Sequence, residues 1–528
     1  MPQHDNLISD GYVTDVAYLP SYYPAMAPAQ MQYVASLNGI APPKTQRQFS
    51  YLELGCGFGS TVLALAAANP NGQFTAIDFM PVHTDHIAVE ANASGLHNLH
   101  IHCADFATLP DDIGGFDFIT LHGVFSWVSP ELRRCILDII RRHLNPGGLV
   151  EVTYNCMPGW ASLLPVRTLL RYFSDKVTGN SVQRVTAALQ EVQNLRKADV
   201  PLFHDQPLAA QLVDKLLNAD PHYVAHEYLN EHWTAFDFAN VQKMFADINL
   251  HYAGRLPVHH NHWQLCAQQQ FASQFSNSGE VETETLKDHH ANIMFRWDLY
   301  SNEPRRQWTA TQRAEATSDL YFRVDPTSGK LPHTVQYGAV EAGINGPPHD
   351  KLLEFMGTAG WRLSELLNCH ELASFSPDII VEAIDTGVAL KLFQVEGGAV
   401  EALAETPSHV EAGTLQVPLL FNQRALRREN FSNEQVGLAS PRTHAGQAIG
   451  DLHALILTEL ISKGSDAIEL RVADKLIAAD KHLREHRTNR PITERAEMIH
   501  AAREICGDFI TRVLPELMRL GVVTTLRP

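Results

Sequence analysis

Short apolar runs alternate with amphipathic or alanine-rich stretches between residues 49 and 154. Each run has the length of a buried strand; the runs are 49–54, 74–77, 99–103, 116–121 and 149–154. The stretches between them predict helices, because prolines and glycines mark their starts and ends. The clearest of these helices are 60–69, 81–94 and 129–143. Strands that alternate with helices at such short intervals predict an α/β fold, with a parallel sheet covered by helices on both faces.

The chain before this region lacks clear periodicity. Residues 1–48 contain a cluster of tyrosines and prolines. This composition fits an N-terminal arm that folds over another part of the protein, and equally a segment that packs on the surface.

The chain after the α/β region has weaker patterns. Residues 160–225 are mainly helical in pattern, and a further helix at 236–247 and a strand at 250–255 follow. The segments 273–283 and 397–413 are rich in polar or small residues, and we interpret them as linkers. A mixed pattern lies between the linkers, and residues 445–520 have apolar positions at helical spacing.

Composition sets the broad class of the protein. The chain has 528 residues, of which 45% are hydrophobic and 19% charged, so an ordinary globular protein of three to four domains is expected. The formal charge of −18 disfavours non-specific binding to nucleic acid, which uses a basic surface. No apolar run is long enough to cross a membrane, and the polar, acidic N-terminus is wrong for a secretory signal. The seven cysteines form no C-x-x-C pair, which predicts a reducing, cytoplasmic location.

A glycine-rich loop carries the strongest chemical signal. The sequence Glu53-Leu54-Gly55-Cys56-Gly57-Phe58-Gly59 joins the first predicted strand to the first helix. Glycines there let the backbone approach a ligand closely, and ligands of open α/β sheets bind at this edge. The spacing is G-x-G-x-G rather than the G-x-G-x-x-G of dinucleotide binding. Glu53 would repel a diphosphate and attract a sulfonium or an ammonium group.

Two further acids follow the next strands. Asp78 ends the second strand, where an acid typically accepts hydrogen bonds from ribose hydroxyls. Asp105 follows the third strand and could accept from an adenine amino group, beside Phe106, which could stack on the ring. Alone, each aspartate would more often be a loop cap. Three acids at successive strand ends are a much more specific pattern.

These motifs resemble the class I S-adenosylmethionine-dependent methyltransferases over residues 51–155. The resemblance includes the E-x-G-x-G-x-G loop, Asp78, the Asp105-Phe106 pair and the turn at 145–148. It implies a Rossmann-like methyltransferase fold with S-adenosylmethionine as the cofactor. The implied cofactor-binding residues are Tyr18, Tyr22, Glu53, Gly55, Gly57, Gly59, Asp78, Phe79, Asp105, Phe106, His122, Gly123 and Val124.

A finer resemblance concerns the segments 121–130 and 154–160. They look like bacterial methyltransferases with a so-called regulatory domain, a group that includes the rickettsial outer-membrane-protein lysine methyltransferases. The resemblance implies an N-terminal arm or lid and three domains. Their expected bounds are 1–48 for the arm, 49–270 for the methyltransferase domain with a helical insertion at about 160–225, 283–397 for the regulatory-type middle domain, and 420–528 for a mainly helical C-terminal domain.

The acceptor side of such a site lies at the ends of the fourth and fifth strands. The candidate catalytic residues there are His122, Trp127, Tyr154 and Asn155, with Trp160 nearby. Aromatic faces attract cations, which suits both a sulfonium and a lysine substrate. A lysine amine must lose a proton before it attacks, and burial favours that loss. His122 could be the base, although contact with the cofactor is the preferred interpretation. Trp127 and Trp160 could equally be core residues.

Other chemistries are weaker candidates. No [Asn/Asp]-Pro-Pro-[Tyr/Phe] run follows the fourth strand, which with the acidic charge argues against a nucleic-acid substrate. His259, His260, His262 and Cys266 invite a metal site, but no carboxylate pattern accompanies them, and a solvated strand end is the preferred interpretation.

The leading hypothesis is methylation of lysine side chains in a protein substrate, such as an outer-membrane or surface protein before export. One alternative is methylation of a small molecule, with the later domains as a lid or dimer contact. Another is a non-catalytic protein that binds S-adenosylmethionine as a sensor or scaffold. The expected partners are therefore a protein or a small molecule, and a second copy of the chain.

Overall fold

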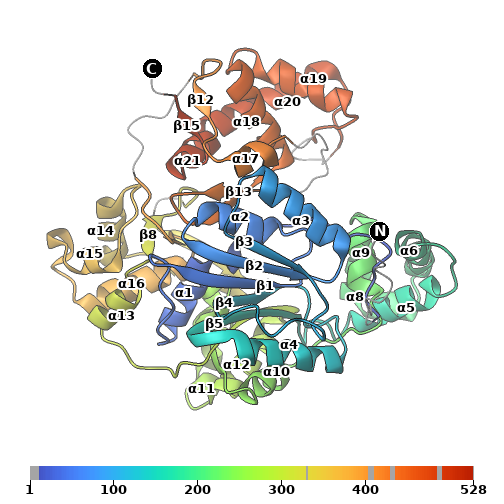
Figure 1. Cartoon of the computed structure of the whole chain (residues 1–528), viewed down its shortest axis with the longest axis horizontal. Helices are drawn as coiled ribbons and strands as arrows, with labels where there is room; N and C mark the ends of the chain where they lie inside the picture. Colours follow the sequence, from blue (N-terminus) through green and yellow to red (C-terminus); the bar gives the residue numbers. More distant parts are fainter. Residues whose placement is uncertain (1–10, 329–330, 402–408, 428–434, 485–489, 527–528) are drawn as a thin grey trace.

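A seven-stranded sheet forms the centre of the protein, in the order β3-β2-β1-β4-β5-β7-β6 (Figure 1). The computed structural model describes residues 11–328, 331–401, 409–427, 435–484 and 490–526. The strands are β1 (Phe49–Leu54), β2 (Gly72–Asp78), β3 (Leu99–Cys103), β4 (Phe116–Leu121), β5 (Leu144–Asn155), β6 (His251–Leu256) and β7 (Phe295–Ser301). Strands β1 to β5 are parallel, whereas β7 is antiparallel to both β5 and β6. The predicted α/β class is confirmed, and the antiparallel strand is an addition to it.

Helices cover both faces of the sheet, as the alternating pattern predicts. Tyr51 of β1 belongs to the core shared with α1 (Pro28–Leu37) and α2 (Ser60–Ala68), and α3 (Pro81–Ala93) contributes Ile87 to it. Its neighbour Leu52 belongs to the opposite core, with α4 (Pro130–His143) and α10 (Phe238–Ala246). Consecutive strand residues point to opposite faces, so the continuous apolar runs follow from burial on both sides. Helix α1 lies within the segment for which no element was predicted.

The predicted helical insertion is present beyond the carboxyl end of β5. It consists of α5 (Leu164–Ser174), α6 (Ser181–Lys197), α7 (Pro201–Asp205), α8 (Pro207–Leu216) and α9 (Pro221–Tyr228). Its apolar side chains form a separate core, which Val13 of the N-terminal arm joins.

The predicted first linker is wrong. Residues 272–291 form α11 (Ala272–Phe275) and α12 (Glu280–Ala291), and β7 follows as part of the central sheet. The sheet therefore extends to residue 301 rather than ending near 270. The polar sequence was interpreted as a linker, but α12 and β7 carry charged side chains that are buried against each other, among them Glu284 and Arg296.

Two further groups of elements flank the sheet. The middle group is α13 (Ala310–Ala316), β8 (Tyr321–Val324), β9 (His333–Tyr337), β10 (Val340–Ile344), α14 (Pro347–Met356), α15 (Leu363–Leu367), α16 (Pro377–Ala389) and β11 (Phe393–Glu396). The C-terminal group is β12 (Leu415–Gln416), α17 (Leu420–Ala425), β13 (Gln435–Ser440), β14 (Ala445–Gly450), α18 (Asp451–Lys463), α19 (Ile468–Ala478), α20 (Arg495–Asp508), α21 (Leu514–Arg519) and β15 (Thr524–Thr525). Part of the second expected linker, 402–408, lies outside the described residues.

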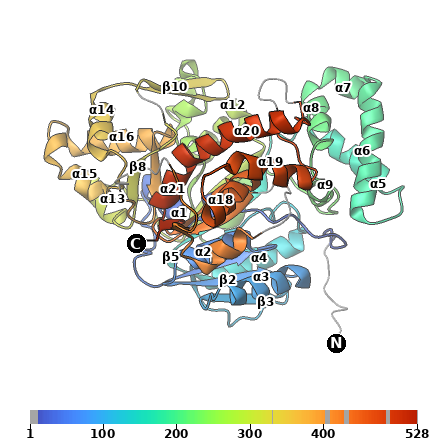
Figure 2. The same ribbon diagram turned by 90° about the horizontal axis from the view of Figure 1, so that it is seen from above.

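The views show how these groups are placed. Helices α5–α8 and α13–α16 lie at opposite ends of the molecule in both views (Figures 1 and 2). Helices α18–α20 form a lobe above α2 and α3 (Figure 1). The hairpin β13–β14, which periodicity did not indicate, joins this lobe to α2. Among the described helices, none combines the length and the apolar character needed to cross a membrane.

Candidate active site

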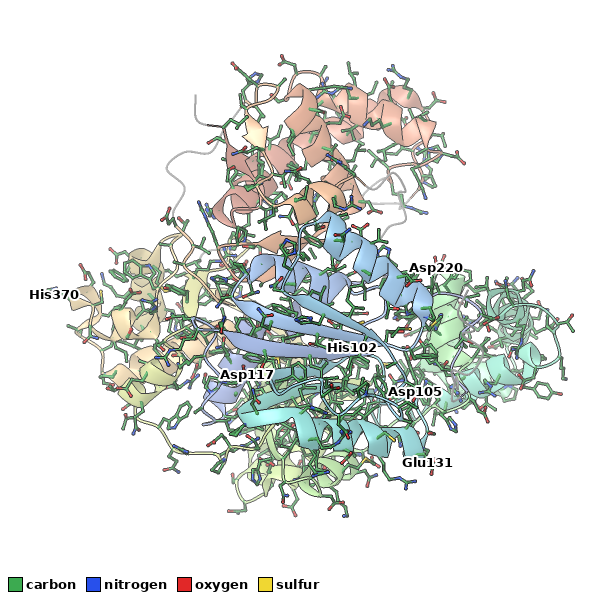
Figure 3. All side chains as sticks on the ribbon, viewed as in Figure 1. His102, Asp105, Asp117, Glu131, Asp220 and His370 are labelled. Atoms are coloured by element: carbon green, nitrogen blue, oxygen red, sulfur yellow. The ribbon has the colours of Figure 1, made fainter. Side chains whose placement is uncertain are left out.

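A cavity of about 390 Å³ lies at the carboxyl ends of β1, β2, β4 and β5. Most residues predicted to hold a ligand line it together. They are Tyr18, Glu53, Gly55, Gly57, Gly59, Asp78, Phe79, Asp105, Phe106, His122, Gly123, Val124, Trp127 and Asn155, and Trp160 also lines the cavity. Asp105 lies on the side of the sheet that faces the helical insertion, and Asp220 marks the start of α9 in that insertion (Figure 3).

The glycine loop has a backbone that other residues would not adopt easily. Gly55 and Gly57 have φ angles of 70° and 54°, in the left-handed region. A Cβ atom on Gly55 would lie 2.5 Å from Cγ2 of Val124, whereas the space beside Gly57 is open to 4 Å. The loop is therefore packed on one side and free to approach a ligand on the other.

Two buried carboxylates flank this loop. Asp78 accepts hydrogen bonds from the backbone N–H of Gly57 and Met80, both at 2.9 Å, and its Oδ1 lies 3.1 Å from His83 Nδ1. Burial, Glu151 and Asp78 raise the pKa of Glu53 to about 8. Among the described residues nothing hydrogen-bonds to Glu53 Oε2. Such an orphaned buried oxygen is costly unless a ligand satisfies it.

The N-terminal arm covers the cavity with three tyrosine rings. Tyr12 packs edge-on to Phe79 with centroids 5.8 Å apart, and Tyr18 packs on Trp127 at 6.2 Å. The ring of Tyr23 lies 3.8 Å from that of His122. Tyr12 and Tyr23, like Tyr18, line the cavity.

The arm is anchored at two places. At one end, the N–H of Glu231 donates to Gly11 O, and the N–H of Val13 donates to Asn230 Oδ1, both at the end of the helical insertion. At the other end, Tyr22 is 3% exposed and packs against the β13–β14 hairpin, where its hydroxyl accepts the N–H of Gly446 at 2.7 Å. Tyr22 therefore does not line the cavity, contrary to its predicted contact with the cofactor. Tyr22 and Tyr23 are adjacent, and only Tyr23 faces the cavity.

Tyr154 does not line the cavity either. Its hydroxyl donates to Asp298 Oδ2 in the interior, while the next residue, Asn155, faces the cavity. Side chains alternate along a strand, so only one of the two can point into the site. The prediction placed both there because strand direction alone does not give the facing side.

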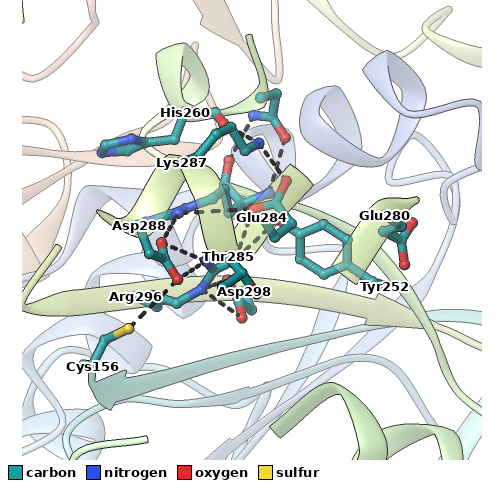
Figure 4. Close-up of polar contacts among 12 residues, drawn as sticks. Cys156, Tyr252, His260, Glu280, Glu284, Thr285, Lys287, Asp288, Arg296 and Asp298 are labelled. Atoms are coloured by element: carbon teal, nitrogen blue, oxygen red, sulfur yellow. Dashed lines mark hydrogen bonds and ion pairs between the residues drawn. The ribbon is translucent and has the colours of Figure 1, made fainter. Parts of the chain in front are cut away.

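Asp298, which accepts this hydrogen bond from Tyr154, belongs to a buried charged cluster. Figure 4 shows the cluster around Arg296. Arg296 pairs with Asp288 at 2.7 Å, with Glu284 at 2.9 Å and with Asp298 at 3.0 Å. Burial alone would raise the pKa of Glu284, but Lys287, Arg296 and Arg255 lower it to about 2. The cluster ties α12, β6 and β7 to the end of β5.

Sequence reasoning missed one wall of the cavity. Tyr223 and Glu227 of α9, with Met294 and Phe295 at the start of β7, form this wall. Asn155 Nδ2 donates to Glu227 Oε1 at 3.3 Å, and burial raises the pKa of Glu227 to about 7. No local motif marks these residues, because tertiary packing alone brings them to the cavity.

His122 is neutral near physiological pH. Burial lowers its pKa to about 3, and among the described residues its Nδ1 has no hydrogen-bond partner. A group with so low a pKa is a poor proton acceptor at neutral pH. The low pKa therefore disfavours a role as base, and contact of His122 with the cofactor stays a prediction.

The histidine group near residue 260 lies elsewhere. His259 and His260 are in the 3-10 turn η2 (Val258–Asn261) rather than on a strand, and both are half-buried. The ring of His259 stacks on Tyr337 with centroids 3.9 Å apart. In the parts of the chain that the structure describes, no three His, Cys, Asp or Glu side chains are grouped to hold a metal ion.

Comparison with known proteins agrees with this geometry. Residues 52–148 match a family described as a methyltransferase domain, and residues 220–301 match a predicted methyltransferase regulatory domain. The uncharacterized protein sll1526 of a Synechocystis strain is 26% identical over 97% of this chain and 99% of its own length. The uncharacterized protein RP789 of Rickettsia prowazekii is 29% identical over 45% of this chain and 43% of its own.

A solved structure has the same fold over nearly the whole chain. PKMT2 from Rickettsia typhi, in complex with AdoHcy, has a TM-score of 0.68 at 18% identity, covering 96% of this chain and 99% of its own. The regulatory-domain match at 220–301 lies earlier than the predicted 283–397, and the two ranges share only 283–301. The predicted bounds rested mainly on length and order along the chain rather than on a motif, and α11 and α12 occupy much of the linker expected at 273–283.

Proposed function

Because this chain is an S-adenosylmethionine-dependent methyltransferase, we propose that it methylates the side-chain amine of lysine in a protein substrate. The observation that carries the proposal is the wall of the cavity beyond the glycine loop. Aromatic rings and one buried carboxylate, Glu227, form this wall. The likeness to PKMT2 agrees with the resemblance of the sequence to rickettsial lysine methyltransferases.

The residues around the glycine loop fit the cofactor. The orphaned oxygen of Glu53 suits the cofactor's amino group, and the open space at Gly57 leaves room for the methionine part. Asp78 keeps lone pairs for ribose hydroxyls, while Asp105 and Phe106 would take the adenine. When bound, the cofactor supplies an electrophilic methyl group on a positively charged sulfur.

The remaining wall suits an alkylammonium side chain. Ring faces such as those of Trp127, Tyr18 and Tyr23 attract cations, and this attraction is strongest when water is excluded. A slender side chain could enter between them. Burial there also favours the neutral amine over the ammonium, which methylation requires.

The arm has a part in this chemistry. Its tyrosines hold water away from the reacting atoms and restrict the orientation of an entering amine. His122, neutral and packed under Tyr23, supports that cover.

The test uses methyl-labelled S-adenosylmethionine and a lysate of the source organism. Label should enter discrete protein bands, survive base treatment and elute as methylated lysine after hydrolysis. The Asp78→Asn variant serves as the control with impaired cofactor binding. Label found only in small molecules would refute the protein acceptor and favour a metabolite. Cofactor binding without any label in either fraction would favour the non-catalytic scaffold.

A further inference from the structure

Glu227 occupies a part of the cavity that the cofactor motifs do not account for. It lies on α9, is 9% exposed and lines the cavity together with Tyr223, Met294 and Phe295. Its hydrogen bond within the described residues comes from the amide of Asn155 at 3.3 Å. A buried carboxylate with one neutral donor is held at a cost, which a bound cation would offset.

Glu227 and the acids near the glycine loop raise the pKa of the same arm tyrosines. Burial, then Asp78 and Glu227, raise the pKa of Tyr12. Burial raises the pKa of Tyr23, and Glu53 and Glu227 both add to that rise. The charge of Glu227 therefore acts on both tyrosines, together with the charge of Asp78 on Tyr12 and of Glu53 on Tyr23. Glu227 and the cofactor acids share one cavity, with the tyrosine rings within reach of both.

The two cations whose charges act on Glu227 are engaged elsewhere or exposed to solvent. Arg167 and Lys215 lower the pKa of Glu227 through space. Arg167 donates its Nη2 to Asn230 O at 2.6 Å and lies over the ring of Trp233. Lys215 is exposed at the surface of α8. Among the described residues neither cation forms an ion pair with Glu227, so its carboxyl group remains available toward the cavity.

We propose that Glu227 forms a binding site for a primary alkylammonium group. It binds the ammonium group of the acceptor and takes one proton from it. The inference rests on the proposed lysine acceptor. The ammonium gives a proton to the carboxylate and becomes a neutral amine, and Glu227 becomes a carboxylic acid. The nitrogen lone pair then forms the N–C bond as the C–S bond breaks, so the sulfur keeps that electron pair as a neutral thioether. The product is a methylated ammonium, and Glu227 returns its proton to water.

This assignment gives the regulatory-domain segment a direct part in the reaction. Glu227, Met294 and Phe295 all fall within the matched range 220–301. The segment would then supply the acceptor side of the active site, while 52–148 supplies the cofactor side. Substrate specificity would accordingly follow from the later segment.

A binding measurement tests the site without relying on turnover. The probes are n-butylammonium and 1-butanol, which have similar shapes but differ in charge. Their affinities for the full chain saturated with S-adenosylhomocysteine are measured at pH 8 by ligand-observed NMR. Wild type should bind butylammonium at least about tenfold more tightly, and Glu227→Gln should lose that preference. Glu191→Gln, an exposed glutamate of α6 in the same insertion, should keep it. Unchanged affinity of Glu227→Gln for S-adenosylhomocysteine shows that the variant is folded.

The outcomes separate this site from the proposed function. Equal binding of both probes to wild type, including no binding of either, overturns the Glu227 site. A preference that survives Glu227→Gln overturns it too. Methylated lysine produced by this variant at the wild-type rate removes Glu227 as proton acceptor but leaves the lysine function standing. Butylammonium selectivity with label only in small amines supports the site and refutes the protein acceptor.

Discussion

The contact between Tyr22 and the β13–β14 hairpin connects the C-terminal part of the chain to the N-terminal arm that covers the cavity. A Cβ atom on Gly446 would lie 2.4 Å from Cζ of Tyr22. The backbone of Gly446 has no left-handed φ, so alanine is tolerated there except for this clash. We therefore expect Gly446→Ala to push Tyr22 out of its site and loosen the adjacent Tyr23.

The size of the effect follows from burial. A buried aromatic ring removes about 150–250 Å² from water, worth about 4–6 kcal/mol at about 25 cal/mol per Å². The compactness of the open arm reduces this value, so Tyr22→Ala should cost about 3–5 kcal/mol of arm docking. Overpacking by Gly446→Ala should cost about 1–3 kcal/mol. Since about 1.4 kcal/mol is a factor of ten, these values correspond to roughly 10²- to 4 × 10³-fold more arm opening for Tyr22→Ala and roughly 5- to 150-fold more for Gly446→Ala.

Two measurements report on the arm. Hydrogen exchange of the segment 11–27 gives the opening equilibrium, because the N–H of Tyr23 donates to Thr61 Oγ1 only when the arm is docked. Calorimetry with S-adenosylhomocysteine gives the affinity of the covered cavity. Gly450→Ala is the matched control in the same hairpin, since a Cβ atom there meets nothing within 4 Å.

A double-mutant cycle tests whether the contact between Tyr22 and Gly446 holds the arm in place. The three atoms nearest to a Cβ at 446 all belong to the Tyr22 side chain, so Gly446→Ala should have a much smaller effect in the Tyr22→Ala background. The expected coupling energy is about 1–3 kcal/mol. Equal effects of Gly446→Ala in both backgrounds would show that the contact does not hold the arm, and the reasoning would be refuted.

Three further predictions concern the acids and the buried cluster. Asp78→Asn should weaken binding of S-adenosylhomocysteine about 10- to 100-fold by calorimetry, because charge-assisted hydrogen bonds are worth about 1.5–3 kcal/mol; the exposed Asp85→Asn should not, and equal affinities of the two variants would remove Asp78 from the site. Glu53 has a pKa of about 8 in the folded protein against an ordinary value of 4.5, so the folded state holds its proton between these pH values while the unfolded state has lost it. Stability without cofactor should therefore fall as pH rises from 5 to 8, by at most about 3–4 kcal/mol from this group, and urea midpoints of Glu53→Gln should fall less; an equal fall would contradict the assignment. Asp288→Asn leaves Arg296 partly unpaired and should lower the free energy of unfolding by about 3–5 kcal/mol in urea, whereas a loss under about 1 kcal/mol would count against a structural role of the cluster.

The sequence alone determined the parts of the fold that depend on local spacing. The five parallel strands, the helices between them and the loop from Glu53 to Gly59 follow from apolar periodicity and from glycine and proline positions. The cofactor side of the cavity is built from residues at consecutive strand ends, so a reading along the chain brings Asp78 and Asp105 to one edge.

The tertiary structure alone decided which residues form the proposed acceptor side and the cover of the cavity. Glu227 reaches the cavity only because α9 folds back onto the end of β5, and nothing local marks it. Tyr22 and Tyr23 are adjacent and chemically alike, yet packing against the hairpin directs one ring away and leaves the other over His122. The polar sequence at 273–283 likewise predicted a linker, whereas α12 begins within it and places Glu284 in the interior, paired with Arg296. Local spacing reports the backbone's own preferences, whereas pairing between distant charges and rings exists only once the chain has folded.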